Sequence, residues 1–376
     1  MNQDASFFSF KRARAVARKE IFHILRDPFT LALALGLPLM MVLIFGVTIN
    51  FDVKNAPIAV DDRDHSQASR ELTQIFANTG AFRVMPVSPQ SNPESLLRSG
   101  RDRAVLIIEP EFEKSLSSGG IARAQLLLDG ADNTTAGSIL GYVAGIQDAA
   151  NRRLVSNLAP PAATLATRYL YNPELSTQWF IVPGLTVAVI SIISIMLTAL
   201  TVAREWENGS MELLLSTPVQ PMELILGKLA PYTVIGLLAV FFIYFVARVV
   251  FFVPFRGSHL VFLAGYFLFL SAYLAQGLLI SVITRTQQVS MQFALISGLL
   301  PSLLLSGFVF PIASMPSIFQ YLTAVFPARW FMTISRDLFL KGTNLSDLGG
   351  PFLALFLLNF ILLSVAGARF KKDLEP

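Results

Sequence analysis

The chain has 376 residues, of which 53% are hydrophobic and only 14% are charged. Soluble globular proteins usually carry about 25% charged residues, so the composition argues against an ordinary cytosolic enzyme. The absence of cysteine excludes disulfide scaffolds, iron–sulfur clusters and a cysteine nucleophile. The net charge of +4 is too small to favour nucleic acid as a partner, and the histidines show no metal-ligand spacing.

Residues 1–28 predict a helix at the cytoplasmic membrane surface. Its apolar side chains recur every three or four residues at Phe10, Ala13, Ala17, Ile21 and Ile24, while basic side chains occupy other faces. An apolar stripe beside a basic face is typical of a helix that lies in the bilayer surface. Two roles stay open: a wall that moves beside a cytoplasmic partner, or a topology anchor attracted by anionic lipids.

Six apolar stretches are long enough, or nearly so, to cross a membrane, because about 30 Å of hydrocarbon needs about 20 helical residues. They run roughly from Phe29 to Ile49, Phe180 to Val202, Tyr232 to Val253, Leu260 to Ile283, Met291 to Phe310 and Pro351 to Ala368. The first stretch is too long for a cleaved signal peptide, so we expect it to remain as transmembrane helix 1, residues 29–50. Residues 179–376 then hold transmembrane helices 2–6.

The loops between these stretches differ in positive charge. Twelve Lys and Arg residues flank the spans on the side of both termini, against four on the other side. Basic residues near helix ends are held on the cytoplasmic side, so both termini are predicted to be cytoplasmic. The segment 51–178 is then extracytoplasmic, and the protein is expected to be a multi-pass protein of the bacterial inner membrane.

Residues 51–178 predict a folded α/β domain. Short β-rich runs and helical patterns alternate, with runs at Ile58–Val60, Phe82–Val87, Ala104–Ile108 and Ala124–Leu128 and helices at Ser66–Ala77 and Pro93–Arg98. This alternation is typical of a small sheet layered with helices. A longer helical pattern from Thr134 to about Leu158 precedes a proline-rich break. The fold class is thus an α-helical polytopic membrane protein with six transmembrane helices and an inserted α/β extracytoplasmic domain.

An acidic cluster directly follows the first of these β-rich runs. Asp61, Asp62 and Asp64 carry the side chains that metal sites and acid–base sites use. Their place at a strand end instead favours a solvated turn, where aspartates are common.

The segment after the second span predicts a short cytoplasmic helix. Gly209 suits the left-handed residue that ends a helix, Ser210 suits an N-cap, and Glu212 lies in the positive first turn of the next helix. Pro218 would stop that helix after about two turns. A short helix fixed at both ends could pass force between a soluble partner and the membrane helices, or it could merely join two spans.

Four hydroxyl side chains share one face of the second span: Ser191, Ser194, Thr198 and Thr201. Small hydroxyl residues let membrane helices approach closely and form hydrogen bonds across an interface. They predict either plain helix packing or a face that borders a translocation path.

Residues 311–341, after the fifth span, contain several prolines and aromatic residues. Broken helices at membrane depth are tolerated only where protein or a water-filled cavity covers them. A re-entrant pair that dips from the outer side would close the outer mouth of a path, and an interfacial aromatic belt is the alternative. The candidate outer-gate residues are Phe308, Pro311, Pro327 and Arg329.

No Gly-x-x-x-x-Gly-Lys-Ser/Thr run occurs in the chain, since Gly227-Lys228 is followed by Leu229. The chain therefore has no ATP-binding motif of its own and is predicted not to be an enzyme by itself.

Several motifs together resemble the ABC-2 type permeases of ATP-binding cassette transporters. The coupling segment of that family is similar to Arg204-Glu205-Trp206-Glu207-Asn208-Gly209-Ser210-Met211-Glu212, followed by Leu215-Ser216-Thr217-Pro218 and Glu223-Leu224-Ile225-Leu226-Gly227-Lys228. The family's N-terminal helix is similar to Arg18-Lys19-Glu20-Ile21-Phe22, and its outer half-helices to Pro327-Ala328-Arg329-Trp330-Phe331. Leu128-Asp129-Gly130 with Gly141-Tyr142 is similar to the subgroup with a large domain between the first two spans. The order of these motifs extends over essentially the whole chain.

The resemblance implies a division of roles between subunits. In this family two permease chains pair in the membrane, and each receives a cytoplasmic ATPase whose groove holds the coupling helix. Residues 204–228 would form this junction, with candidate contacts at Arg204, Glu205, Glu207, Gly209, Ser210, Glu212, Thr217 and Pro218. ATP and Mg²⁺ would be bound by the partner ATPase, and the chain itself would hold no cofactor or metal.

The expected function is that of an exporter permease for a hydrophobic or amphiphilic substrate, either a drug-like compound or an ion. The subgroup often works with a periplasmic adaptor, and the second permease could be this chain or a close homologue. Membrane lipids are further expected contacts. Two alternatives stay open: a lipid or glycan exporter permease, and a membrane receptor that senses a ligand through its outer domain.

Overall fold

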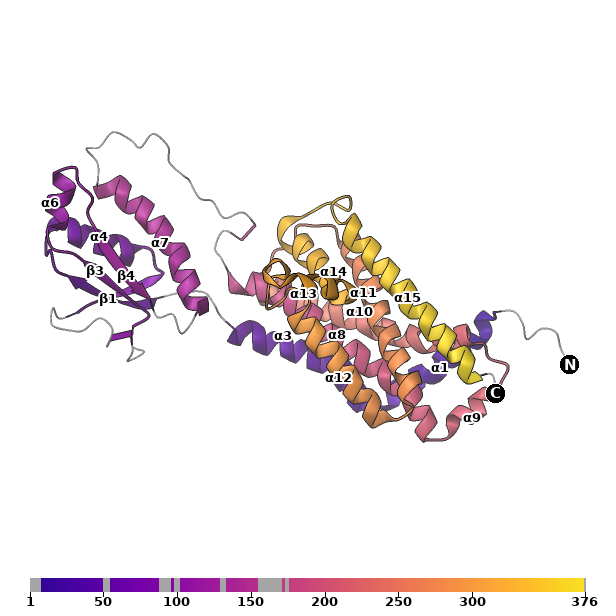
Figure 1. Cartoon of the computed structure of the whole chain (residues 1–376). Helices are drawn as coiled ribbons and strands as arrows, with labels where there is room; N and C mark the ends of the chain where they lie inside the picture. Colours follow the sequence, from indigo (N-terminus) through magenta and orange to yellow (C-terminus); the bar gives the residue numbers. More distant parts are fainter. Residues whose placement is uncertain are drawn as a thin grey trace. The chain divides into compact units, whose positions relative to one another are not determined.

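The computed structural model describes residues 8–49, 55–87, 96–97, 102–128, 133–154, 171–172 and 176–374. The chain divides into two compact units, Met1–Ile49 with Gln178–Pro376 and Asn50–Thr177, and each has its own hydrophobic core (Figure 1). The first is the helical unit and the second is the α/β unit.

The α/β unit is built on a four-stranded sheet of order β2-β1-β3-β4. Its strands are β1 (Ala56–Asp62), β2 (Phe82–Pro86), β3 (Ala104–Ile108) and β4 (Ala124–Leu128). The pairs of β1 with β2 and with β3 are parallel, and β4 runs antiparallel to β3. The strands lie within a residue or two of the predicted β-rich runs, because short apolar runs such as Ala104–Ile108 mark buried strands.

Helices α4 (Gln67–Asn78) and α7 (Asn133–Leu154) pack against each other and bury one face of the sheet. The short helix α6 (Phe112–Ser117), which the pattern did not predict, precedes β4. The predicted helix Pro93–Arg98 lies outside the described residues apart from Leu96 and Leu97, as do the residues after Leu154 up to Leu170.

The acidic cluster was predicted to be a solvated turn, but Asp61 and Asp62 are the last residues of β1 and Asp61 is buried; only Asp64 lies in the bend that follows. One carboxylate oxygen of Asp62 accepts from the backbone N–H groups of Asp64 and His65, at 3.1 and 3.0 Å, and the other accepts from the Ser69 hydroxyl at 2.7 Å. These bonds fix the start of α4, where Ser66 is the N-cap. Among the described residues, no group of three or more acidic, His or Cys side chains is arranged to hold a metal ion.

The helical unit begins with α1 (Phe10–Arg26), followed by α2 (Pro28–Leu31), the π-helical turn η2 (Ala32–Gly36) and α3 (Leu37–Thr48). It continues with α8 (Thr177–Glu207), α9 (Ser210–Leu215), α10 (Pro221–Val249), α11 (His259–Thr284) and α12 (Gln287–Leu304). The last part comprises η3 (Ile312–Ser314), α13 (Ser317–Leu322), η4 (Thr323–Val325), α14 (Pro327–Arg336), η5 (Asp337–Lys341) and α15 (Gly349–Leu374).

Four of these helices are long and apolar enough to cross a membrane: α8, α10, α11 and the part Gly349–Phe370 of α15. They correspond to the predicted spans two, three, four and six. In α8, 78% of the most apolar window is buried inside the structure, against 17% in α15. Helix α8 is therefore central, and α15 presents most of its surface outward.

The first and fifth predicted spans differ from their expected form. The first is helical but consists of α2, η2 and α3, and its apolar helix Ala32–Thr48 is shorter than the four long ones. The fifth was expected to continue to Phe310, but α12 ends at Leu304. Pro301 lies in its last turn, and Gly307 follows with a φ of +84°, so the backbone leaves the helix before Phe308. The count of six spans stays a prediction.

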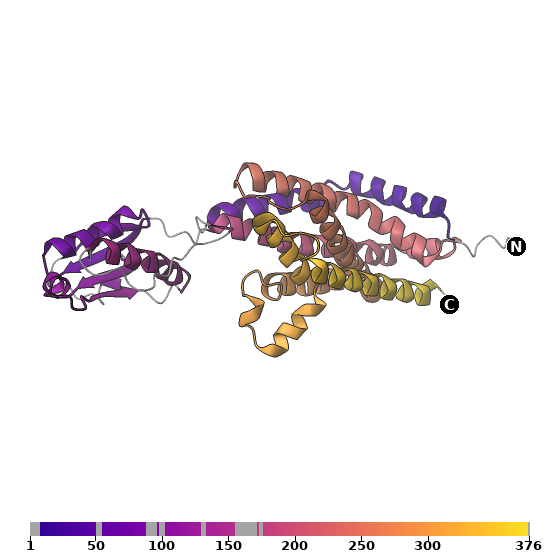
Figure 2. The same ribbon diagram turned by 90° about the horizontal axis from the view of Figure 1, so that it is seen from above.

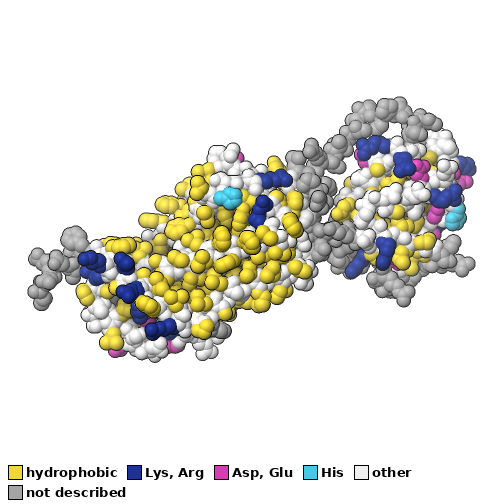
Figure 3. Space-filling model, turned by 180° about the vertical axis from the view of Figure 1, so that it is seen from behind, with side chains coloured by type: hydrophobic (Ala, Val, Ile, Leu, Met, Phe, Trp, Pro, Cys, Tyr) yellow, Lys and Arg dark blue, Asp and Glu magenta, His cyan; other side chains and the backbone are white. Residues whose placement is uncertain are grey.

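The surface of the helical unit is consistent with lipid around it. Figure 3 shows a broad area of hydrophobic side chains, with Lys and Arg side chains gathered towards the end where the chain starts. An exposed hydrophobic area of this extent is unusual on a protein that is surrounded by water on all sides. Figures 1 and 2 both show the start of α1 and the end of α15 at the same end of this unit.

Candidate functional site

The short helix α9 joins the two long helices α8 and α10, as the sequence predicts. Gly209 has a φ of +69° and ends α8 in the left-handed conformation that glycine adopts without strain. Gly209, rather than Ser210, is the N-cap of α9; the Ser210 hydroxyl reaches back to the carbonyl oxygen of Glu205 at 3.3 Å. The N-cap prediction was wrong by one residue because a positive φ was needed at the junction itself. Pro221 begins α10, as expected.

The outer face of α9 is free of intramolecular cover. Glu212, Thr217 and Pro218 are exposed, and the side chain of Leu213 is 73% exposed. The hydroxyl of Thr217 donates to the carbonyl oxygen of Leu214 at 2.6 Å, which closes the end of α9. In Figure 1, α9 lies at the same end of the helical unit as the start of α1 and the end of α15. An exposed leucine beside a carboxylate gives this face both apolar and charged contacts to offer.

The other charged candidates, Arg204, Glu205 and Glu207, bond to neighbouring helices; Glu205 is buried, whereas Glu207 is exposed. Both carboxylate oxygens of Glu207 accept from Gln287, one from the backbone N–H at 2.8 Å and one from the side-chain amide. This ties the end of α8 to the start of α12. Arg204 approaches α1 and its successor α2, with one guanidinium nitrogen 3.0 Å from Nε2 of His23 and 3.9 Å from a carboxylate oxygen of Asp27. These two side chains join helices.

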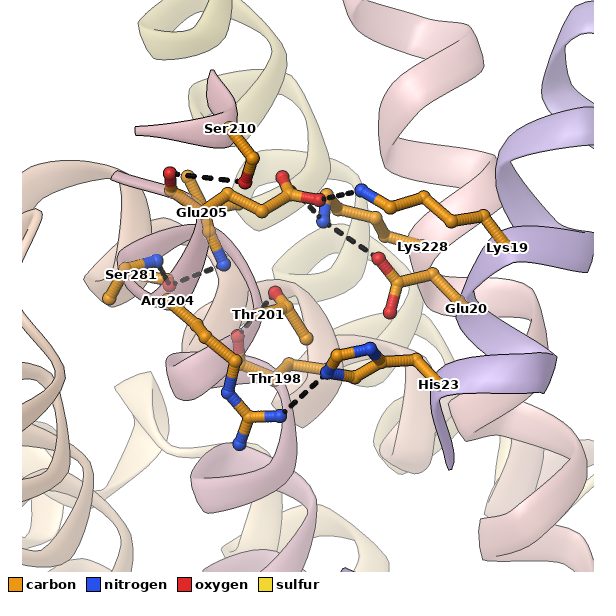
Figure 4. A network of polar contacts seen from close by, with 12 residues as sticks. Lys19, Glu20, His23, Thr198, Thr201, Arg204, Glu205, Ser210, Lys228 and Ser281 are labelled. Carbon is orange, nitrogen blue, oxygen red and sulfur yellow. Dashed lines mark hydrogen bonds and ion pairs between the residues drawn. The ribbon is translucent and has the colours of Figure 1, made fainter. Parts of the chain in front are cut away.

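Glu205 belongs to a network of buried charges (Figure 4). The ammonium of Lys228, in α10, lies 2.9 Å from a carboxylate oxygen of Glu20 and 2.9 Å from one of Glu205. The Glu20 contact is a hydrogen bond, whereas the Glu205 contact lacks hydrogen-bond geometry and is an ion pair. Lys19 donates to the second oxygen of Glu205 at 2.6 Å. The network therefore connects α1, α8 and α10.

The network separates into buried and accessible charges. The side chain of Lys228 is 1% exposed, and those of Glu20 and Glu205 are 7% and 9% exposed. The side chain of Lys19 is 51% exposed. Two buried carboxylates thus share one buried ammonium, and the fourth charge comes from the protein surface.

Helix α1 is held against α10 along its length. Glu223, in the first turn of α10, accepts from Arg12 at 2.7 and 2.8 Å and from the backbone N–H of Ser9. The bond to Glu223 raises the pKa of the Arg12 guanidinium above its ordinary value. Gly227 allows close approach, because a Cβ there would lie 2.7 Å from Cβ of Val16. Ala13 and Ile24 of the predicted apolar stripe are therefore buried against protein, whereas Phe10 and Ile21 are exposed, so a position of α1 in the bilayer surface stays a prediction.

A cavity of about 220 Å³ lies beside the charged network. On α8 its lining changes from apolar residues such as Leu197 and Leu200 to polar ones such as Thr201 and Glu205. The same change occurs from Leu33, in η2, to Glu20, in α1. The cavity therefore has an apolar end and a polar end.

The hydroxyl face of α8 is a packing face in this structure. Ser191, Ser194, Thr198 and Thr201 are buried, and only Thr201 lines the 220 Å³ cavity. The hydroxyls of Ser191, Thr198 and Thr201 donate to carbonyl oxygens of α8 itself. Gly277 of α11 packs so closely on Thr198 that no side chain would fit there.

The outer-gate candidates do not form one cluster of contacts. Phe308 is buried and packs where Gly184 of α8 leaves room, whereas Pro311 is exposed. Pro327 is the buried first residue of α14. Arg329 donates to the carbonyl oxygen of Gln320 and to the hydroxyl of Thr323, at 2.5 and 2.6 Å, which fastens α13 to α14.

Arg336 is a residue of this outer region that sequence analysis missed. Its guanidinium donates to the carbonyl oxygens of Gly307 and Phe308, at 2.9 and 3.3 Å, where the backbone has left α12. The guanidinium also stacks 4.1 Å above the ring of Phe180. It therefore joins the broken segment to α8 and α14.

Sequence analysis did not predict that Glu20 and Lys228 form a buried ion pair, but the position of Glu20 indicates that it is buried. Glu20 falls on the same helical stripe as Ala13, Ala17 and Ile24, where an acidic residue is unexpected. A charge on an apolar stripe requires a buried partner. Lys228 could not be identified as that partner, since the pairing depends on how α1 packs on α10.

Comparisons with known proteins agree with the motifs. A family model described as ABC-2 family transporter protein matches residues 28–368. The chain is 37% identical over 340 residues to the probable multidrug ABC transporter permease YbhS of Escherichia coli (strain K12), which covers 89% of this chain and 90% of that protein. It is 31% identical over 369 residues to the probable multidrug ABC transporter permease YbhR of the same organism, covering 96% and 99%. The inner membrane transport permease YhhJ is 28% identical over 334 residues, covering 85% and 86%.

Proposed function

This chain belongs to the ABC-2 transporter family, and on that premise we propose that it is the membrane-spanning permease subunit of an ATP-binding cassette exporter. It would move a hydrophobic or amphiphilic compound out of the cytoplasm or the inner leaflet. The names of two relatives, probable multidrug ABC transporter permeases, support that substrate class. The energy would come from a separate ATPase subunit, which binds ATP and Mg²⁺.

The observation that carries the proposal is the exposed face of α9. A docking surface needs apolar area and a charge that selects the partner, and Leu213 with Glu212, Thr217 and Pro218 supplies both. These four residues are the proposed ATPase contacts. Glu212 and Leu213 lie on α9, and Thr217 and Pro218 lie in the segment that joins α9 to α10.

Charged side chains beside α9 would transmit the motion of the ATPase. Glu205 and Glu207 lie within five residues of α9 and are bonded to α1, α10 and α12. A displacement of α9 would therefore move several helices together rather than bend one loop. Interactions in a dry site are stronger than at the surface, which suits a rigid link through the buried Glu205.

The remaining parts of the proposal concern topology and partners. Both termini and α9 would be cytoplasmic, residues 51–178 would be extracytoplasmic, and α3 and α12 would complete a set of six spans. Two permease chains, identical or closely related, would pair in the membrane, and a periplasmic adaptor would extend the path. The twelve-to-four distribution of basic residues supports this orientation.

The test is to purify the tagged chain in mild detergent and to identify and assay the proteins that accompany it. We expect a stoichiometric P-loop ATPase, and we expect Glu212→Lys and Leu213→Asp to lose it while the permease keeps its unfolding temperature. Ser346→Lys, an exposed change outside α9, is the control and should retain the ATPase. Recovery of a signalling protein without nucleotide hydrolysis would support a receptor instead.

A further inference from the structure

The cavity beside the buried charges has the form of a site for an amphiphile. Its volume of about 220 Å³ exceeds that of the roughly 150 Å³ apolar cavities that can hold a benzene ring. The apolar end lies between η2 and α8, and the polar end carries Glu20 and Glu205. A ligand with an apolar body and one polar group would satisfy both ends.

The charges at the polar end favour a cation. Glu20 and Glu205 are both nearly buried, and Lys228 is the one fully buried ammonium that contacts them. Lys228 can offset only one of the two negative charges. The second charge on Glu205 is met by Lys19, whose side chain is about half exposed and reaches in from α1. A buried carboxylate needs such a counter-ion, whatever molecule supplies it.

Arg204 does not neutralise the negative charge at the polar end of the cavity. It also lines the cavity, but its guanidinium lies 3.9 Å from the carboxylate of Asp27 and 3.0 Å from the His23 ring. Because a guanidinium can only donate, Nε2 of His23 is the acceptor in that contact. The Arg204 charge is thus matched by Asp27, and Glu205 keeps the need for a further cation.

We propose that this cavity binds an amphiphile with a single ammonium group, which takes the place of Lys19 on Glu205 while the apolar body lies between η2 and α8. Lys19 is then a tethered substitute that occupies the carboxylate when no ligand is bound. The proposal rests on the proposed function for its physiological meaning, since it names the class of compound that would enter this subunit. Binding itself can be measured without any ATPase.

If Lys19 occupies Glu205 in place of a ligand, Lys19→Ala should bind the cationic ligand more tightly. A ligand that must displace Lys19 binds with an affinity reduced by the fraction of time that the carboxylate is free. If Lys19 occupies Glu205 for about nine-tenths of the time, its removal tightens binding about tenfold. An anionic headgroup would instead lose a positive contact and bind more weakly.

The experiment uses the full chain in phosphatidylcholine nanodiscs with dansylcadaverine, a fluorescent amphiphile with one ammonium group. Its N-acetyl derivative is the neutral control, and empty nanodiscs give the background. We expect Lys19→Ala to bind the cation about tenfold more tightly and Glu205→Gln to bind it at least severalfold more weakly. Neither change should alter the weak binding of the neutral derivative. Lys11→Ala, an exposed lysine of the same helix that does not line the cavity, should match the unmodified protein.

A third variant keeps the test decisive if Glu205→Gln fails to fold. Leu200→Trp fills the apolar end and should abolish binding of the cation, whereas Leu263→Trp on the exposed side of α11 should not. Unchanged or weaker cation binding by Lys19→Ala, equal binding of the neutral derivative, or full binding by Leu200→Trp would each overturn the proposal. Failure of the proposed function would be distinguishable, because it would show as a missing ATPase in purifications of the unmodified chain.

Discussion

Lys228 contacts two neighbouring helices through buried charges. Its ammonium lies 2.9 Å from Glu20 in α1 and 2.9 Å from Glu205 in α8. We expect Lys228→Met to destabilise the helical unit strongly, because breaking a buried ion pair by removing one partner costs about 3 to 5 kcal/mol. Glu20→Gln should cost clearly less, since Lys228 then still faces Glu205. Thermal unfolding in detergent compares the two variants, and an equal loss of stability would contradict this account of the network.

Asp64 gives the α/β unit a dependence on pH. Its carboxylate accepts from the Ser66 hydroxyl and from the backbone N–H of Glu113, which lowers the pKa of Asp64 below its ordinary value. A carboxyl whose pKa is lowered on folding stabilises the folded state above its unfolded pKa, about 3.9, and this contribution is lost as the pH falls further. We therefore expect the difference in unfolding temperature between the protein and Asp64→Asn to be independent of pH above about pH 5. Below about pH 4 the two unfolding temperatures should converge. A difference in unfolding temperature that grows as the pH falls would contradict this account of Asp64.

At the level of residues, local backbone features could be predicted from the sequence better than contacts between distant side chains. The left-handed Gly209 and the bend after Asp62 follow from local chemistry, and both are present. The eight coupling candidates were treated as one surface, but Glu205 is buried and the exposed Glu207 is bonded to Gln287 of α12, whereas Glu212 is exposed on α9. Which side of a helix end is covered depends on the packing of distant helices, so no local pattern could separate them.

Helix α9 is an element whose direction depends on one backbone conformation. Gly209 has a φ of +69°, and nothing lies within 4 Å of the place where a Cβ would be. A change to alanine therefore adds no clash but strains the backbone by roughly 1 to 2 kcal/mol. We expect Gly209→Ala to weaken retention of the ATPase partner, and Gly209→Asn to retain it better because asparagine tolerates this conformation. Co-purification measures both, and equal retention would show that this conformation does not set the position of α9.

The broken segment after α12 is the second element with a specific support. The guanidinium of Arg336 holds the carbonyl oxygens of Gly307 and Phe308. The chain has no cysteine, so a single Val309→Cys reports on this segment alone. We expect Arg336→Met to raise the rate of maleimide labelling at that cysteine severalfold, whereas Lys341→Met, which removes a nearby ion pair, should leave it unchanged. Identical rates would mean that Arg336 does not restrain the segment.

Helices and strands could be predicted where an apolar stretch contains no residue that breaks the element. Helices α8, α10, α11 and α15 and all four strands follow their patterns closely. The end of α12 was missed because apolar residues continue through Phe310 although Pro301 and Gly307 break the helix. Hydrophobicity reports burial or lipid contact, and it does not distinguish a helix from an irregular segment that protein covers.

The whole molecule combines an apolar helical unit with one end rich in basic residues. Figures 1 and 2 place the start of α1 and the end of α15 at the same end, and Figure 1 shows α9 there as well. This arrangement is what the charge distribution predicts for a permease whose termini and coupling helix face the cytoplasm. Membership in the ABC-2 family then accounts for the absence of a P-loop motif from the sequence, because the ATPase is expected on another chain.

The most direct measurement is a photo-cross-link from α9 in native membranes. A benzophenone maleimide is attached to Leu213→Cys, and Ser346→Cys serves as the control at an exposed position outside α9. The account predicts one cross-linked product from Leu213→Cys, in which the partner is a protein with a P-loop, and no such product from Ser346→Cys. A cross-link to a protein without a nucleotide site, or labelling of Leu213→Cys only from outside the cell, would contradict the assignment of α9 as the ATPase-docking helix.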